Sequence, residues 1–465
     1  MKAAAGEPAA ERGDSMPGEA TGTRDEPGTG GEDVRETPEA GGGASLRGAG
    51  WALAGLGVVI GAVAWFSTPW RTLPAGAPHV APDPARDFTA EQIARARAFD
   101  AALSVPSYLS LALTLLVAGV LVATPAGALL AARLRGPWWV RALCAVAALT
   151  AVTELLRWPL GMWYESRLRD YGLSVQTWGS WAGDRLKSAG VETLLTAAMI
   201  VVVIALARRF ARWWIPAAAG AFALTVAASF VYPVVVEPLF SDFTPMAQGP
   251  LRRDLLAMAE RDGVPVEDVL VADASRRTTA LNAYVSGFGA TRRIVVYDTL
   301  LKAPPREVEL VVAHELGHAK RNDVLYGTLL GALGGAAGVV LLHLVTSAGP
   351  VRRRTRVSSL ADPRAVGLLM GLMTLGAVLS GPAQNVISRH IEARADAHAL
   401  DLTRDPATFV AMQKRLAITN ISDLSPDVVE YVLYASHPAT PERIALARSW
   451  ALLNRLPAPP GNAGP

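Results

Sequence analysis

The chain has 465 residues, of which 51% are hydrophobic and only 18% are charged, and its mean hydropathy is +0.27. Because globular proteins carry about 25% charged residues, this balance argues against an ordinary soluble enzyme, excludes a wholly disordered chain and favours a membrane protein. The net charge of +3 is too small to indicate nucleic-acid binding. A single cysteine, Cys144, excludes a disulfide scaffold and a cysteine-rich zinc module.

The first segment, residues 1–47, is rich in Gly, Glu, Ala, Pro and Thr and has almost no clustered aliphatic side chains. Such a segment cannot bury a core, so we expect a disordered tail. It differs from a signal peptide, because no apolar stretch follows an early basic start.

Seven long apolar runs follow, and each approaches the roughly 20 residues that a helix needs to cross the hydrocarbon core of a bilayer. The third run carries Glu154 and Arg157, and the fourth has Glu192 near its start, so these two are the weaker candidates. Several tryptophans lie near the ends of the runs, as in an aromatic belt. The seven runs are 48–70, 101–132, one that begins at Ala142, 188–207, 213–236, 324–351 and 365–388.

Two polar blocks interrupt and follow these runs. The first, 237–323, has an amphipathic helical pattern over 250–262 and strand patterns over 269–272 and 293–297. The second covers 389–465. Because the sixth and seventh runs form a hairpin, both blocks lie on one side of the membrane and can build one domain. We therefore expect a mainly α, polytopic membrane protein with about seven transmembrane helices and a polar domain that contains a small β-sheet.

The first polar block contains His314-Glu315-Leu316-Gly317-His318, which is the His-Glu-x-x-His pattern. Residues four apart lie on one face of a helix, so both imidazoles can reach one metal ion. Glu315 projects beside them and can take a proton from a water on the metal. The competing interpretation is a structural histidine pair on an ordinary amphipathic helix.

A catalytic zinc ion normally takes three protein ligands and leaves one position for water. The only cysteine lies in a predicted span, so the third ligand is a His, Glu or Asp. The best candidates are Glu392 and Asp396, which are again four residues apart: one can bind the metal while the other holds a ligand histidine. On spacing alone they equally suit a solvated helix face. His390 and His398 are further candidate ligands.

Several motifs occur in a fixed order along the chain: 87–93, 171–174, 243–245, 282–284, 294–301, 314–318, 392–396 and 437–444. This series resembles the type I CAAX prenyl protease family, multi-spanning zinc metallopeptidases that include the yeast a-factor-processing enzyme; HtpX-type bacterial membrane proteases are more distant relatives. The resemblance covers about residues 87–450. It implies a metallopeptidase domain formed by the two polar blocks.

The resemblance also implies roles for single residues. His314, His318 and Glu392 would bind one zinc ion per chain, and Glu315 would be the general base. Asp396 would orient a ligand histidine. The remaining roles concern substrate. His437 would stabilise the oxyanion of the tetrahedral intermediate, and Arg443 would support that site. Asn282, in the strand-like stretch before the turn at Gly287 and Gly289, would hold the substrate backbone, as in β-augmentation.

The predicted organisation follows from the runs and the motifs together. It comprises a disordered tail (1–47), transmembrane helices 1–5 with their loops (48–236), the first part of the metallopeptidase domain with the His-Glu-x-x-His motif (237–323), transmembrane helices 6 and 7 (324–388) and the second part of that domain (389–465).

The predicted function is an integral-membrane zinc endopeptidase that resembles CAAX C-terminal processing proteases and acts through water activated by Glu315. Its partners would be a peptide or protein substrate and the lipid bilayer, without nucleic acid, while the oligomeric state stays open. The alternatives are an HtpX-like quality-control protease of membrane proteins, a transporter, and a catalytically inactive scaffold. A transporter is disfavoured because no internal repeat occurs. Residues 319–323 depart from eukaryotic members, which often have a Trp and a further His there.

The side of the catalytic face in the cell membrane also stays open. Three short arginine-rich loops lie opposite the polar blocks, and the positive-inside rule makes their side cytoplasmic. The family resemblance implies the reverse, a cytoplasmic catalytic face. The arginines are Arg133, Arg135, Arg141, Arg208, Arg209, Arg212, Arg352, Arg353, Arg354 and Arg356.

Overall fold

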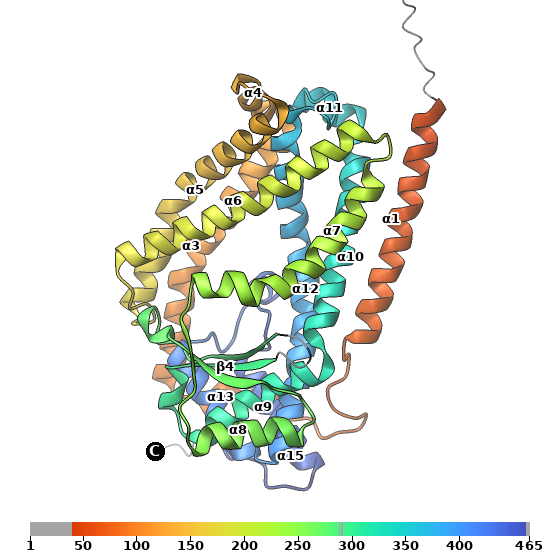
Figure 1. Cartoon of the computed structure of the whole chain (residues 1–465). Helices are drawn as coiled ribbons and strands as arrows, with labels where there is room; N and C mark the ends of the chain where they lie inside the picture. The colour runs from red at the N-terminus through yellow and green to blue at the C-terminus, as the bar shows by residue number, and fades with distance from the viewer. Residues whose placement is uncertain (1–39, 288, 290–291, 462–465) are drawn as a thin grey trace, which may run out of the picture. The chain divides into compact units, whose positions relative to one another are not determined.

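The computed structural model describes residues 40–287, 289 and 292–461 of the chain (Figure 1). The chain divides into two compact units, 1–43 and 44–465. Of the first unit only 40–43 are described, and they form the opening turn of helix α1 (Ala40–Ser67). Most of the expected tail, residues 1–39, lies outside the described residues, whereas 40–47 are helical.

In the described part of the chain, seven helices are long and apolar enough to cross a membrane. This confirms the prediction of a mainly helical protein with about seven transmembrane helices. The seven helices are α1, α3 (Ala90–Ala123), α5 (Trp138–Asp170), α6 (Trp178–Arg209), α7 (Trp214–Val231), α10 (Asp323–Ser347) and α12 (Val366–Thr403).

The second apolar run, 101–132, is not one helix as its composition suggested. A break at Pro125 separates α3 from the short helix α4 (Ala126–Arg133), because proline lacks a backbone donor and disfavours helical geometry in the residue before it. The chain then returns against α12. A Cβ atom on Gly127 would lie only 2.7 Å from the Cα atom of Gly367, so both positions need glycine for this close approach.

The charged residues that made the third run a weak candidate for a membrane span are paired with each other and with the neighbouring helix. Glu154 of α5 accepts a hydrogen bond of 2.6 Å from Arg185 of α6, and Arg157 lies 3.8 Å from the other oxygen of the same carboxylate. Charged groups inside a membrane segment are costly unless they find such partners. These charges are therefore compatible with helices that span the bilayer.

A four-stranded sheet lies in the first polar block. Its strands, in spatial order, are β1 (Phe243–Pro245), β2 (Asp268–Ala272), β4 (Arg293–Tyr297) and β3 (Ala283–Ser286). β2 and β4 are parallel and the two outer pairs are antiparallel. The sequence predicted β2, β4 and the strand-like stretch after Asn282 that forms β3, and the structure adds the short edge strand β1.

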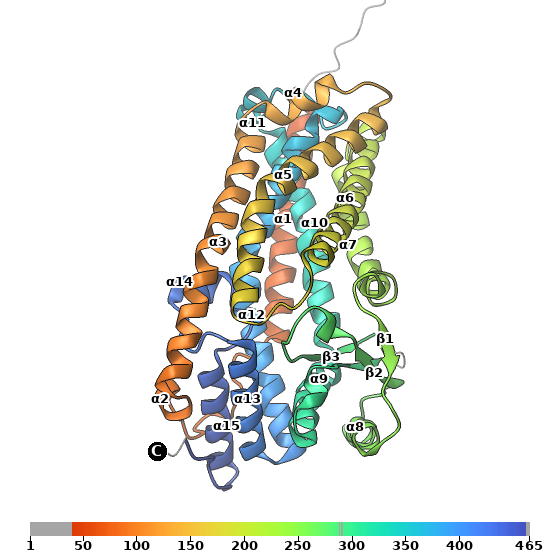
Figure 2. The same cartoon turned by 90° about the vertical axis from the view of Figure 1, so that its left-hand side faces the viewer.

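Four helices pack beside and below the sheet, whereas a short fifth helix lies beside α3 and contacts α12 (Figure 2). One hydrophobic core draws on both polar blocks, with Leu255, Val308 and Ile294 from the first and Phe409 and Trp450 from the second. The four helices are α8 (Pro250–Arg261), α9 (Pro305–Arg321), α13 (Pro406–Asn420) and α15 (Thr440–Leu453), and the short fifth helix is α14 (Val428–Leu433).

The arginine-rich loops gather at the other end of the helices. They accompany α4 and a second short helix, α11 (Gly349–Thr355), which lie together at the end farthest from α8 and α15 (Figures 1 and 2). Arg208 donates to the backbone carbonyl of Ala361 at 3.0 Å, which ties the end of α6 to the segment before α12.

A buried ion pair fastens the segment before the second span to the last helix. Arg448 of α15 is 1% exposed and forms two hydrogen bonds, of 2.7 and 2.5 Å, with the carboxylate of Asp87 at the end of α2 (Pro84–Asp87). Arg448 also donates to the carbonyl oxygens of Pro459 and Pro460. One guanidinium thus joins three separate segments of the chain.

Substitution of one partner of this pair should destabilise the polar domain strongly. Asp87→Asn leaves a buried guanidinium without its counter-charge, which typically costs about 3–5 kcal/mol. Thermal unfolding of the purified protein in detergent should therefore show a clearly lower melting temperature. Asp170→Asn, which removes an exposed pair with Arg167, is the control and should change it little. Equal melting temperatures for both variants would contradict the stabilising role of the Asp87–Arg448 pair.

Candidate active site

Helix α9 brings the two histidines of the motif onto one face. Pro305 occupies its first turn, where the missing backbone donor is harmless, and the helix ends at Asn322, which adopts a left-handed conformation with φ of 54°. Between these ends, His314 and His318 lie one turn apart, and their imidazole rings meet edge to face at 4.8 Å. His314 is buried, whereas His318 is partly exposed.

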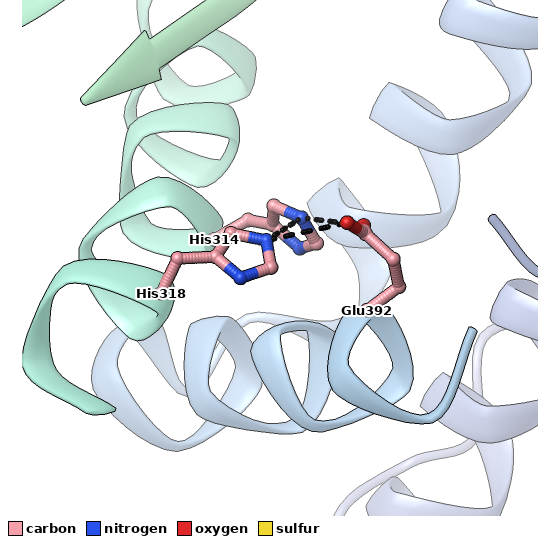
Figure 3. Close-up of side chains that lie close together, drawn as sticks. All are labelled: His314, His318 and Glu392. Atoms are coloured by element: carbon pink, nitrogen blue, oxygen red, sulfur yellow. Dashed lines mark hydrogen bonds and ion pairs between the residues drawn. The ribbon is translucent and has the colours of Figure 1, made fainter. Parts of the chain in front are cut away.

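Helix α12 supplies the third group because it is unusually long. It has 38 residues, and its last turns leave the apolar span and pack against α9. Glu392 on this extension points at the two histidines (Figure 3). Its Oε2 atom lies 3.1 Å from Nε2 of His314, and its Oε1 atom lies 3.5 Å from Nε2 of His318.

The spacing and chemistry of these three groups fit a tetrahedral metal ion. The two Nε2 atoms are 3.1 Å apart. Zinc bonds of about 2.0–2.1 Å at tetrahedral angles separate neighbouring ligand atoms by roughly 3.3 Å, close to the distances observed here. Two imidazole nitrogens and one carboxylate are also a ligand set that catalytic zinc sites use, with the fourth position left for water.

Each histidine is held from behind by a carboxylate. Asp396 of α12 lies 2.9 Å from Nδ1 of His314, and Asp323 lies 3.0 Å from Nδ1 of His318. A carboxylate that accepts the Nδ1 proton leaves the Nε2 lone pair free to point at a metal. Burial opposes the charged form of His314, yet the hydrogen bonds with Asp396 and Glu392 raise its pKa to about 10. The carboxylates of Asp396 and Glu392 thus favour a positive charge at His314.

The sequence did not indicate a role for Asp323. It showed only that the Trp and the further His found after the motif in many eukaryotic members are absent here. Asp323 is five positions from His318, and this spacing does not share a face in a continuous helix. It reaches the histidine because the chain turns at Asn322 between α9 and α10. The role of Asp323 could have been predicted from its position, because it directly follows Asn322, a residue type that often ends a helix.

Arginines neutralise both supporting carboxylates. Arg443 of α15 donates two hydrogen bonds to Asp396, of 2.8 and 2.5 Å, and Arg394 of α12 donates to Asp323. Arg443 is therefore three contacts away from Glu392 through Asp396 and His314, and its guanidinium also lies 3.4 Å from Nδ1 of His314. The sequence had indicated Arg443 only through family resemblance.

Two further groups interact with the side chains of the site. Burial raises the pKa of Glu315, while the neighbouring His314 and His318 oppose this rise. His437, in the loop before α15, places its Nε2 atom 3.4 Å from Oε2 of Glu392 and keeps more than half of its side chain exposed. Partial burial lowers the pKa of His437, while the Glu392 carboxylate opposes this shift.

The other candidate ligands lie elsewhere. His390 packs edge-on against Trp70, with ring centroids 5.2 Å apart. His398 bonds Asp262 at 3.0 Å and packs so closely on α9 that a Cβ atom at Gly317 would lie 3.1 Å from it. Neither belongs to the His-His-Glu group of the described residues.

Asn282 lies at the entrance to the edge strand β3. The residue is exposed and directly precedes the strand, and its backbone carbonyl accepts a hydrogen bond of 3.0 Å from the backbone of Tyr297 on β4. Because β3 pairs only with β4 in the described part of the sheet, its other edge is open.

Comparison with known proteins identifies the family to which the chain belongs. The model of Peptidase family M48 matches residues 245–451, and that of the CAAX prenyl protease N-terminal, five membrane helices, matches residues 80–242. An uncharacterised metalloprotease of Bacillus subtilis, YhfN, is 33% identical over 309 residues, which cover 64% of this chain and 71% of that protein. The chain belongs to the CAAX prenyl protease family of M48 peptidases.

Other members agree with this assignment. CAAX prenyl protease 1 of Saccharomyces cerevisiae is 26% identical over 332 residues, 65% of this chain and 71% of the yeast protein. The crystal structure of S. mikatae Ste24p has the same fold, with a TM-score of 0.68 and 23% identity over 85% of this chain and 97% of that one. The predicted family is thus confirmed, and the chain is a multi-pass membrane metalloprotease.

Removal of the carboxylate at Asp323 should weaken metal binding. Asp323→Asn keeps the size of the side chain but loses the charge that holds His318, and loss of such a supporting group typically costs about 10–100-fold in metal affinity. Competition between the purified variant and a fluorescent zinc chelator measures the change. Asp362→Asn, at the arginine-rich end, is the control with the same charge change. Unchanged affinity in Asp323→Asn would show that His318 needs no such support.

Proposed function

We propose that this metalloprotease is a zinc-dependent endopeptidase in which His314, His318 and Glu392 hold one zinc ion per chain. The observation that carries the proposal is the convergence of two Nε2 atoms and one carboxylate at 3.1–3.5 Å, with a carboxylate behind each histidine. When bound, zinc polarises the scissile carbonyl and lowers the pKa of a coordinated water to about 7.

The remaining proposed steps belong to side chains of the chain itself. Glu315 takes the proton of the attacking water and delivers it to the leaving amine. His437, as a neutral or protonated donor, gives a hydrogen bond to the oxyanion that develops on the scissile carbonyl. Arg443 keeps Asp396, and through it His314, in position. The roles of His437 and Arg443 are supported by the contacts described above, and that of Glu315 by its place in the His-Glu-x-x-His motif.

The open edge of β3 suits the substrate backbone. In an antiparallel pair, hydrogen-bonded residues alternate with residues whose backbone groups point away. The bond from Tyr297 to the carbonyl of Asn282 fixes this alternation, so the backbone groups of Ala283 and Val285 point to the open edge. We propose that an extended peptide pairs there, with Asn282 beside it, which is β-augmentation.

The physiological substrate follows from the relatives only as a proposal. Several of them are named CAAX prenyl proteases, which supports removal of a C-terminal segment from a protein at the membrane. General turnover of membrane proteins, as in HtpX-like proteases, is the second candidate. Proteomic comparison of cells with the normal protein and with Glu315→Gln should reveal the uncleaved substrate and separate the two.

Glu315→Gln should abolish cleavage without loss of zinc. The amide cannot accept a proton, and removal of a general base typically lowers the rate about 10²–10⁴-fold. The measurements are peptide cleavage and metal content of the same purified sample, each with and without a chelator. Glu309→Gln is the control on the same helix, because Glu309 pairs with Arg306 and not with the site. Normal cleavage by Glu315→Gln would contradict the mechanism, and zinc-loaded but inactive normal protein would indicate a scaffold.

The orientation in the membrane can be tested with single cysteines. In a Cys144→Ser background, Ser358→Cys reports on the arginine-rich end and Ser425→Cys on the catalytic end, and both serines are exposed. An impermeant thiol reagent added to intact cells reaches only the outer side. Labelling of Ser358→Cys alone supports a cytoplasmic catalytic face, whereas labelling of Ser425→Cys alone supports the positive-inside rule.

A further inference from the structure

A pocket of about 450 Å³ lies where the open edge of β3 meets the membrane helices. Tyr284, Val285, Ser286 and Gly287 all line it. Successive residues of a strand alternate between its two faces, so a pocket that contacts four of them in a row lies beside the edge of the strand and not over one face. This is the same edge that the proposed function assigns to the substrate backbone.

The opposite wall comes from the membrane segment. It includes Ala228 of α7, Tyr232 and Pro233 of the π-helical turn η1 (Tyr232–Val236), Glu237 just after that turn, and Val324 at the start of α10. Val324 directly follows Asp323, whose carboxylate holds His318. One residue of the pocket wall is thus the direct chain neighbour of a residue that contacts His318.

The carboxylate in this pocket has polar neighbours but no ion-pair partner in contact with it. Glu237 is half-buried, and among the described residues no Lys, Arg or His nitrogen lies within 4.0 Å of its carboxylate. The hydroxyl groups of Tyr284 and Ser286 and the more distant positive charge of Arg293 on β4 all interact with it. Ser286 is 6% exposed, and its Oγ atom faces the pocket side near Glu237 without a hydrogen bond of normal geometry among the described residues.

The two faces of β3 determine which substrate side chains reach this pocket. Ala283 and Val285 pack on the hydrophobic core with α9, so Tyr284 and Ser286 project from the other face. A peptide paired with the strand has the same alternation. Every second side chain of the substrate then points toward Glu237 and Ser286.

We propose that this pocket binds a lysine or arginine side chain of the substrate, with Glu237 as its counter-ion. The inference rests on the proposed peptidase function and on pairing of the substrate with β3. The apolar wall of Ala228, Pro233 and Val324 covers the aliphatic stem of a basic side chain while its charged end meets the carboxylate. An acidic side chain is repelled by Glu237, and an apolar one leaves Glu237 without a counter-ion. A basic residue is therefore preferred at one substrate position.

Cleavage of a positional-scanning set of peptides tests this preference. One position at a time carries Lys, Leu or Glu, and mass spectrometry of the products locates the scissile bond and gives kcat/KM. We expect one position at which Lys exceeds Leu roughly tenfold or more, because a charge-assisted hydrogen bond in a partly buried pocket has that effect. Equal rates for Lys, Leu and Glu at every position would overturn the proposal.

Substitutions of Glu237 test whether this residue causes the preference for a basic side chain. Glu237→Gln should reduce the Lys-to-Leu ratio at that position about tenfold, and Glu237→Lys should favour the Glu peptide. Glu260→Gln, an equal charge change on the exposed surface of α8, should leave the ratio unchanged. If Glu237→Gln keeps the full ratio, Arg293 already neutralises Glu237 and the proposal is wrong.

Binding separates this proposal from the peptidase function. Fluorescence anisotropy of the same labelled peptides with the Glu315→Gln protein reports affinity without turnover. Tighter binding of the Lys peptide, lost in Glu315→Gln/Glu237→Gln, supports the pocket even if no cleavage is found. Cleavage by the normal protein with no charge preference in either assay would overturn the pocket and leave the peptidase function intact.

Discussion

The contact between α9 and the extension of α12 is the constraint on which the site depends. Neither helix carries the whole His-His-Glu group: α9 has the two histidines, and α12 has Glu392, with Asp396 behind His314. Asp396 is fully buried and bonds both His314 and Arg443. A buried carboxylate is stable only with such partners, so the position of α15, which carries Arg443, is coupled to the orientation of a ligand histidine.

The catalytic end and the membrane end are also joined by single continuous elements. α12 begins in the apolar span and ends beyond Asp396, and α10 begins at Asp323, which holds His318. The two carboxylates that orient the histidines thus lie on the two helices of the hairpin formed by the sixth and seventh spans. A tilt of either helix to match bilayer thickness would act directly on the geometry of the site.

The large features could be predicted from the sequence because strong physical constraints produce them. A bilayer requires long apolar helices, and the His-Glu-x-x-His spacing uses the helical repeat itself, so both are visible in one chain. Features that depend on a local turn were missed. The break at Pro125 divides an apolar run of nearly constant composition, and Asp323 reaches His318 only through the left-handed Asn322. The edge strand β1 has only three residues, too few for a clear alternation.

The open edge of β3 needs protection as well as access. An unpaired strand edge can pair with strands of other chains, and proteins normally cover or shorten such an edge. Here the strand is short, and the pocket wall formed by η1 and α10 stands beside it, so a long foreign strand cannot approach freely. A single extended peptide can reach it along the wall. In the proposed mode of binding, the same arrangement that limits access to the edge also positions the substrate backbone, with Glu237 beside it.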